Sequence, residues 1–182
     1  MDKAEKQLET ENIYSGRIIK VRKDSVLLPN GHKSIREVVE HSGGVCIAPL
    51  TADGELIFVR QYRYPYSKEI LELPAGKLDR KGENPLEGGK RELREETGAK
   101  AEEYIDLGTL YPSPGYSDEV IYMYLARGLS YGEQDPDDDE FIDVVKLPFD
   151  KALKMVMDGE IPDSKSQTAV LKAALLLGKT KY

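Results

Sequence analysis

The residues with the clearest capacity for chemistry are three glutamates within one short segment, residues 91–96, whose sequence is RELREE. In an α-helix, Glu92, Glu95 and Glu96 stand at positions i, i+3 and i+4, which places their carboxylates on one face. One interpretation is a solvated helix face with ion pairs to neighbouring lysine and arginine side chains. The other is a site for a hard divalent cation such as Mg²⁺, which prefers oxygen ligands and is often shared between protein carboxylates and substrate phosphates.

A helix is framed around these glutamates by residues that favour its two ends. Asn84 is a good N-cap, Pro85 suits the first helical position, and Gly98 can adopt the left-handed conformation that ends a helix. The sequence therefore predicts a helix of about 12 residues between Asn84 and Gly98.

Hydrophobic and β-branched patterns predict the elements around this helix. Asn30-Gly31 and the segment 52–54 (ADG) indicate tight turns between strands. The expected strands cover residues 18–28, 34–39, 45–50, 56–63, 105–111, 119–126 and 141–147, and two amphipathic helices cover 149–157 and 164–177. Strands mixed with a central helix and later helices predict an α/β or α+β fold, in which helices cover a sheet.

The size of the chain, 182 residues of which 40% are hydrophobic and 32% charged, is that of one globular domain with room for a small additional piece. The segment 41–44 (HSGG) interrupts the strand pattern and marks the best boundary. We therefore expect an N-terminal β-sheet arm over residues 1–42 and a main domain over residues 43–182.

The charge balance limits the classes of partner. The 33 acidic residues outnumber the 26 basic ones and give a net charge of -7, which does not favour binding to nucleic acid or to an anionic membrane. No apolar run approaches the roughly 18 residues of a membrane span, and the charged N-terminus lacks the apolar stretch of a secretory signal. Cys46 is the single cysteine, which suits a reducing compartment. We expect a soluble cytoplasmic protein with no nucleic-acid or membrane partner.

A wider pattern around the helix resembles the signature box of the Nudix hydrolases. It runs from Gly76 through Glu83 to residues 91–99 (RELREETGA), in the family's order of a glycine, a glutamate, then Arg-Glu-aliphatic-x-Glu-Glu-x-Gly-aliphatic. Seven residues separate Glu83 from Arg91, as in the family. Six residues stand between Gly76 and Glu83 where the family usually has five, and Gly82 can absorb the additional one in the loop.

The resemblance implies a strand, loop and helix unit within an α/β/α sandwich, and hydrolysis of a nucleoside diphosphate linked to another moiety. The cofactor would be Mg²⁺, with Mn²⁺ as the alternative. The implied metal ligands are the carboxylates of Glu92, Glu95 and Glu96 and the backbone carbonyl of Ala75. The resemblance also pairs Arg91 with Glu83, so that these two residues and Glu95 support catalysis.

Residues 113–119 (SPGYSDE) resemble one branch of the family, the ADP-ribose pyrophosphatases. Pro114 falls sixteen residues after Gly98, an offset that is typical of this branch, and Glu119 ends the pattern. We expect both residues to contribute to the substrate site. The alternative is that residues 111–119 are only a rigid loop, made by Pro112, Pro114 and Gly115.

Two arginines and one glutamate are further candidates for binding substrate. Arg60 and Arg63 lie in the segment RQYR at the end of an expected strand, where the branch directs its second arginine at the substrate. A guanidinium group fits phosphate oxygens in pairs, so Arg63 is the expected clamp on the diphosphate. Glu72 could contact adenine or ribose. All three could also be ordinary surface or strand-edge residues, and the sequence selects none of its eleven tyrosines as a base-stacking platform.

An acidic stretch, residues 132–140 (GEQDPDDDE), contains six acids and no base. Such a run is usually a solvated loop. Here it precedes a segment that resembles the position where this branch carries a catalytic glutamate. Glu140 is therefore the candidate that orients or deprotonates the attacking water, with Asp138 and Asp139 as alternatives.

Taken with the resemblance, the sequence predicts a metal-dependent Nudix hydrolase that cleaves ADP-ribose to AMP and ribose 5-phosphate. It also predicts a homodimer in which residues 1–42 are exchanged between subunits. One alternative is a different nucleoside diphosphate sugar or dinucleotide as substrate, such as ADP-glucose or NADH. Another is a ligand-binding or regulatory protein of the same fold without turnover. A third, processing of RNA, is disfavoured by the acidic balance.

Overall fold

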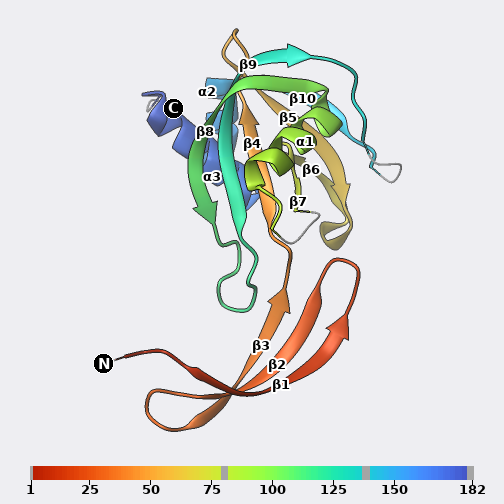
Figure 1. Ribbon diagram of the computed structural model, residues 1–182. Helices are drawn as coiled ribbons and strands as arrows, with labels where there is room; N and C mark the ends of the chain where they lie inside the picture. The colour runs from red at the N-terminus through yellow and green to blue at the C-terminus, as the bar shows by residue number, and fades with distance from the viewer. Residues whose placement is uncertain (1, 79–81, 137–139, 180–182) are drawn as a thin grey trace. The chain divides into compact units, whose positions relative to one another are not determined.

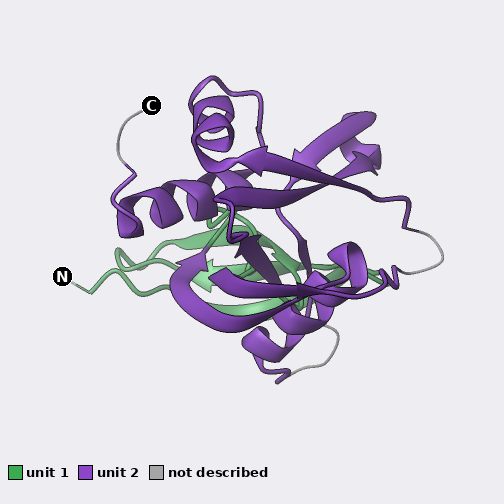
Figure 2. Ribbon diagram, turned by 90° about the horizontal axis from the view of Figure 1, so that it is seen from above, with its two compact units in different colours: residues 1–43, 111–120 green, residues 44–110, 121–182 purple. Residues whose placement is uncertain are grey.

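The computed structural model describes residues 2–78, 82–136 and 140–179. The chain forms two compact units, coloured separately in Figure 2. The first comprises residues 1–43 and 111–120, and the second comprises residues 44–110 and 121–182. No helix in the described part of the chain is long and apolar enough to cross a membrane.

The first unit is an antiparallel sheet in the order β1-β2-β3, made of β1 (Lys6–Ser15), β2 (Lys20–Leu27) and β3 (Lys33–Glu40). The turn between β2 and β3 contains Gly31 with a φ of 83°, so the hairpin predicted at Asn30-Gly31 is confirmed. The strand β1 was not predicted, because its side chains are exposed and mostly polar. It forms a strand because it pairs with β2 along its length.

The second unit contains two sheets, in the orders β7-β4-β9-β8 and β10-β5-β6 (Figure 1). Within the first sheet β4 and β9 are parallel, whereas every other pair in the two sheets is antiparallel. The strands are β4 (Gly44–Pro49), β5 (Glu55–Arg63), β6 (Lys68–Glu72), β7 (Ala75–Lys77), β8 (Ala99–Leu110), β9 (Ile121–Tyr131) and β10 (Asp143–Pro148). A short 3₁₀ helix, η1 (Tyr64–Tyr66), joins β5 to β6.

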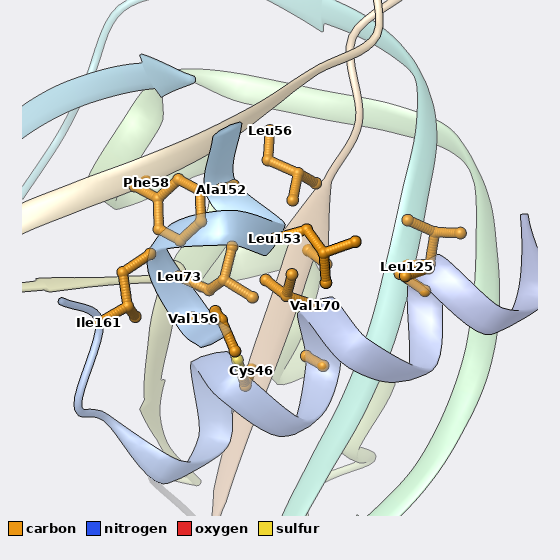
Figure 3. Close-up of a cluster of buried hydrophobic side chains, with 14 of the residues drawn as sticks. Cys46, Leu56, Phe58, Leu73, Leu125, Ala152, Leu153, Val156, Ile161 and Val170 are labelled. Carbon is orange, nitrogen blue, oxygen red and sulfur yellow. The ribbon is translucent and has the colours of Figure 1, made fainter. Parts of the chain in front are cut away.

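In the described part of this unit, three helices cover the sheets: α1 (Pro85–Thr97), α2 (Phe149–Met157) and α3 (Ser164–Leu176). The side chains of β4 alternate between two apolar clusters, because successive residues of a strand point to opposite faces. Val45 and Ile47 pack with Leu93 of α1, while Cys46 packs with residues of α2 and α3 (Figure 3). The strand therefore lies between two helical layers, and the predicted mixed α/β sandwich is confirmed.

The predicted central helix is α1, and its ends agree with the prediction. Two short strands, β6 and β7, were not predicted. They are only five and three residues long, and their formation depends on pairing with β5 and β4 respectively. Of these two strands, β7 lies against α1.

Candidate active site

The candidate site is built on α1, whose two ends are capped as expected. The Asn84 side chain accepts a hydrogen bond from the Leu86 N–H at 2.9 Å, and Pro85 begins the helix. At the other end, Gly98 has a φ of 69° and its N–H donates to the Arg94 carbonyl at 2.8 Å. Leu93 is fully buried, so it fixes the rotation of α1 and thereby the direction of the glutamates on either side of it.

Glu92 and Glu96 are buried against β7. Their exposed fractions are 8% and 1%, which are unusual values for carboxylates. The Ala75 N–H donates a hydrogen bond to Glu96 Oε2 at 3.0 Å. The Glu92 carboxylate lies over Gly76, where a Cβ atom would be only 2.0 Å from its carboxyl carbon. The glycine of the sequence motif is therefore required because the carboxylate occupies the place of a side chain.

This close approach predicts the effect of adding one methyl group. Gly76→Ala should destabilise the protein by about 1 to 3 kcal/mol, because either β7 or Glu92 must move. Gly115→Ala is the matched control, since a Cβ there meets no atom within 4 Å and should change stability by less than about 0.5 kcal/mol. Denaturant unfolding of both variants measures the difference. Equal stability of the two variants would contradict the contact between Gly76 and Glu92.

Glu95 is placed differently from the other two glutamates, because two arginines bind it. Arg91 Nη1 lies 2.8 Å from Glu95 Oε2, and Arg94 Nη2 lies 3.1 Å from Glu95 Oε1. Arg91 Nη1 is also 2.8 Å from Glu92 Oε1, and Arg91 Nε is 3.9 Å from Glu83 Oε1. Arg91 thus contacts three glutamates. Through this contact Arg91 holds Glu83 beside the helix. The loop residues 79–81, which precede Glu83, lie outside the described residues.

Burial dominates the electrostatics of the two inner glutamates. It raises the pKa of Glu92 to about 7 and that of Glu96 to about 8. The negative charge of Glu140 raises both pKa values further, which places Glu140 within electrostatic reach of the pair. Asp138 and Asp139, the alternatives to Glu140, lie outside the described residues.

The segment that leads toward Glu140 is attached to the C-terminal end of α1. The Gln134 side chain donates to the Glu96 carbonyl at 2.5 Å, and the Asp135 N–H donates to the Glu95 carbonyl at 3.0 Å. These carbonyls belong to the last turn of the helix, where carbonyl groups have no hydrogen-bond donor within the helix itself. We call residues 132–135 the helix clamp, because Gly132 N–H also donates to the Gly98 carbonyl at 2.8 Å.

Arg63 and Glu72 form a bidentate ion pair at the ends of β5 and β6. Arg63 Nε and Nη2 donate to the two carboxylate oxygens of Glu72 at 2.7 and 2.8 Å. Burial would raise the pKa of Glu72, but the hydrogen bonds from Arg63 and the charge of Lys165 lower it below its ordinary value. Both residues line a pocket of about 330 Å³, together with Tyr66 and Lys165. Tyr66 is the tyrosine that lines this pocket among the described residues.

Arg60, Pro114 and Glu119 are the remaining residues that the sequence predicts for the substrate site. Arg60 is exposed, and because it is three residues before Arg63 on β5 the two side chains point to opposite faces of the strand. Pro114 and Glu119 belong to the first unit. There Glu119 Oε1 lies 3.4 Å from Nδ1 of His41, and Pro114 is exposed.

Sequence reasoning missed two residues of this region, Lys165 and Gln134. Lys165 stands four residues before Ala169, which belongs to the buried stripe of α3. The sequence feature that could have identified Lys165 was its place on this buried face of the helix. Gln134 had no comparable signal, because its partner is a main-chain carbonyl at a distant position in the chain.

Comparisons with known proteins identify the family of this chain. Residues 40–166 match the model of the NUDIX domain, and residues 5–39 match that of the nucleoside diphosphate sugar hydrolase N-terminal domain. A methanol dehydrogenase activator from Bacillus methanolicus is 45% identical over 168 residues, which are 91% of this chain and 90% of the relative. An ADP-ribose pyrophosphatase from Bacillus subtilis (strain 168) is 41% identical over 177 residues, which are 94% and 95% of the two chains.

The fold also matches a solved structure. The crystal structure of an ADP compounds hydrolase superimposes with a TM-score of 0.84 at 23% identity, over 98% of this chain and 97% of the other. At this identity the likeness concerns the fold. Because the NUDIX model covers more than half of the chain and the two relatives match almost all of it, this chain belongs to the Nudix hydrolase family.

Proposed function

We propose that this chain hydrolyses the pyrophosphate bond of ADP-ribose, with Mg²⁺ or Mn²⁺, to give AMP and ribose 5-phosphate. The observation that carries the proposal is the buried pair Glu92 and Glu96 within reach of the charge of Glu140. The choice of ADP-ribose is supported by the relative that is 41% identical and is named an ADP-ribose pyrophosphatase.

The donor chemistry of this pair fits a hard divalent cation. Among the described residues no three acidic, histidine or cysteine side chains are grouped in a metal-binding arrangement. Glu92 and Glu96 nevertheless supply oxygen atoms in consecutive turns, and their raised pKa values show how poorly the protein alone accommodates their charge. A cation would relieve that cost. Glu92 and Glu96 would hold it, with Glu95 and the Ala75 carbonyl as additional ligands.

Each side chain then has a defined task in the reaction. When bound, the divalent cation supplies a Lewis acid that offsets the charge developing on the diphosphate. Arg63 donates hydrogen bonds to diphosphate oxygens and holds them in place. Glu140 accepts a proton from the attacking water, whose oxygen forms a bond to one phosphorus as the bridging oxygen departs. Arg91 keeps Glu83 and Glu95 beside the helix.

Release of AMP tests this function. The purified protein is incubated in parallel with ADP-ribose, ADP-glucose and NADH, with Mg²⁺, with Mn²⁺ and with a chelator. We expect ADP-ribose to have the highest kcat/KM and the chelator to abolish turnover. A preference for ADP-glucose or NADH would contradict the substrate. The Glu96→Gln variant, prepared in the same way, shows whether the activity belongs to this chain.

A regulatory function is the second candidate, because the relative that is 45% identical is named an activator of a dehydrogenase. Such a protein need not turn over a nucleotide. The same assay separates the two functions, since the absence of AMP release with every substrate and both metals would favour regulation.

Metal binding should depend on pH in a defined direction. The unfolded chain releases the protons of Glu92 and Glu96 near the ordinary pKa of about 4.3, whereas the folded chain retains them up to about pH 7 to 8. The folded state therefore binds more protons in this range, and the metal-free protein should lose stability as the pH rises through it. Since the cation requires the ionised carboxylates, Mg²⁺ should raise Tm more at about pH 8.5 than at about pH 6.

Thermal unfolding with Mg²⁺ and with chelator, at both pH values, measures this dependence. Glu87→Gln is a matched control, because Glu87 is an exposed glutamate of the same helix that pairs with Lys90. It should preserve the pH dependence, whereas Glu96→Gln should diminish it. If Mg²⁺ raised Tm equally at both pH values, the expected pH dependence of metal binding would be contradicted.

We also propose that the protein is a cytoplasmic homodimer in which the N-terminal arm, residues 1–42, contacts a second copy. The arm exposes several large apolar side chains, among them Ile13, Tyr14, Ile18 and Ile35. The buried single cysteine is compatible with a reducing compartment. Analytical ultracentrifugation should give twice the mass of one chain, and Ile13→Asp combined with Ile35→Asp should weaken the association.

A further inference from the structure

Lys165 is a largely buried cation in an electrostatically unfavourable position. It is the second residue of α3, next to the positive end of the helix dipole, and its side chain is only 12% exposed. Burial lowers the pKa of a lysine, yet the charges of Asp163 and Glu72 raise the pKa of Lys165 above its ordinary value. The protein therefore keeps a charged ammonium group in a place that needs specific compensation.

That compensation joins Lys165 to the ion pair beside the candidate active site. Its Nζ contacts Glu72 Oε2 and lies 3.0 Å from Asp163 Oδ1. Glu72 Oε2 also accepts the hydrogen bond from Arg63 Nη2. The four side chains form a row of alternating charges in the order Arg63, Glu72, Lys165 and Asp163, with a formal sum of zero.

The geometry of Arg63 shows what this row holds in place. Arg63 uses Nε and Nη2 to bind Glu72, so that the other edge of the guanidinium, with Nη1, is turned away from that carboxylate. The Arg63 side chain is 37% exposed, and Arg63 and Lys165 line the same pocket of about 330 Å³. The hydrogen bonds to Glu72 and, more weakly, the negative charge of Glu96 raise the pKa of Arg63, so Arg63 is within electrostatic reach of the glutamate cluster.

Two hydrogen bonds that do not involve Lys165 already hold the start of α3 in place. The Ser166 hydroxyl accepts a hydrogen bond from the Leu73 N–H at 2.8 Å, and Asp163 accepts one from the Ser166 N–H at 3.0 Å. These two bonds fix the start of the helix and the chain that follows Glu72. The specific contribution of Lys165 is a second cation on Glu72 Oε2.

We propose that Lys165 is a positioning residue of the hydrolase site, which fixes the Glu72 carboxylate and thereby the edge of Arg63 that is presented to the substrate diphosphate. The inference rests on the proposed hydrolysis of ADP-ribose and adds to it a residue that acts through Arg63 without touching substrate. The Glu72 carboxylate keeps one orientation when both Arg63 and Lys165 bind it. If Arg63 alone binds it, the carboxylate can rotate, and the Arg63 guanidinium rotates with it.

The first test compares three substitutions at this position. Lys165→Met should raise KM for ADP-ribose about 10-fold and change kcat by less than about 3-fold, because Arg63 binds the diphosphate in substrate and transition state alike. Lys165→Arg, which keeps the charge, should restore KM to within about 3-fold of wild type. Lys165→Gln serves if the methionine variant does not fold. Lys154→Met, at an exposed lysine paired with Asp158, is the control for loss of a surface charge.

A double-mutant cycle with Arg63→Met separates positioning from general destabilisation. If Lys165 acts through Arg63, the KM of the double variant should equal that of Arg63→Met alone. KM effects that multiply in the double variant would overturn the proposal, as would an unchanged KM in Lys165→Met. All assays are run below the lowest Tm of the set, so that loss of folded protein does not contribute.

Binding of inorganic pyrophosphate, measured by calorimetry in the presence of a chelator, repeats the cycle without turnover. We expect Lys165→Met to weaken this binding about 10-fold, and to have no further effect in the Arg63→Met background. If the wild-type protein releases no AMP, the proposed function is wrong. The role of Lys165 is then tested by pyrophosphate binding alone. Equal affinity in wild type and Lys165→Met, or no binding by wild type, would overturn the positioning role.

Discussion

Replacing Glu96 by glutamine should reduce kcat for ADP-ribose by about 1000-fold or more, while it makes the metal-free protein more stable at alkaline pH. The loss of activity follows from the loss of a negatively charged oxygen ligand in the glutamate cluster. The gain in stability follows from burial, because above about pH 8 the wild-type protein must hold an ionised carboxylate that is 1% exposed. Glutamine can still accept the hydrogen bond from the Ala75 N–H.

Two measurements on the same sample test this pair of effects. Steady-state kinetics gives kcat, and denaturant unfolding at about pH 8.5 in chelator should give a gain of more than about 1 kcal/mol. Glu87→Gln, the exposed glutamate of the same helix, should change neither quantity appreciably. A Glu96→Gln protein that retains most of its kcat would remove Glu96 from the metal site.

Glu140→Gln should lower kcat by about 100-fold or more and change KM only modestly. Glutamine has nearly the shape of glutamate but cannot accept a proton from the attacking water. The expected split between kcat and KM arises because, in the proposed mechanism, Glu140 acts on the water and not on the bound nucleotide. The acidic limb of the pH profile of kcat should also weaken, since that limb reports the ionisation of the general base.

Asp135→Asn is the matched control for Glu140. Asp135 precedes Glu140 in the same acidic stretch, and its exposed carboxylate pairs with Arg94 at 3.3 Å. An exposed pair of this kind contributes little, so kcat should stay within about 3-fold of wild type. An unchanged kcat in Glu140→Gln would direct attention to the other acids of residues 132–140.

The parts of the structure that the sequence predicted are those that depend on neighbouring residues. Asn84, Pro85 and Gly98 frame α1 because capping is decided within one turn of the helix. The shared face of Glu92 and Glu96 follows from the same local geometry. The tight turn at Gly31 is a further example, because a positive φ is a property of one residue.

The parts that were not predicted depend on contacts between distant positions. The strand β1 is exposed and mostly polar, and it exists because β2 pairs with it. The pairing of Lys165 with Glu72 joins residues that are 93 positions apart, so no local pattern connects them. Likewise, the different environments of Glu95 and Glu96 depend on how deeply each side chain enters the space beside β7, which spacing along a helix does not determine.

The helix clamp, residues 132–135, has a mechanical consequence. Its hydrogen bonds to the carbonyls of Glu95 and Glu96 make the start of the acidic stretch travel with the helix that carries the glutamates. A chain extends by at most about 3.6 Å per residue, so Glu140 can be no more than about 18 Å from Asp135. The helix that carries the glutamate cluster therefore also limits how far from it Glu140, the proposed proton acceptor, can lie.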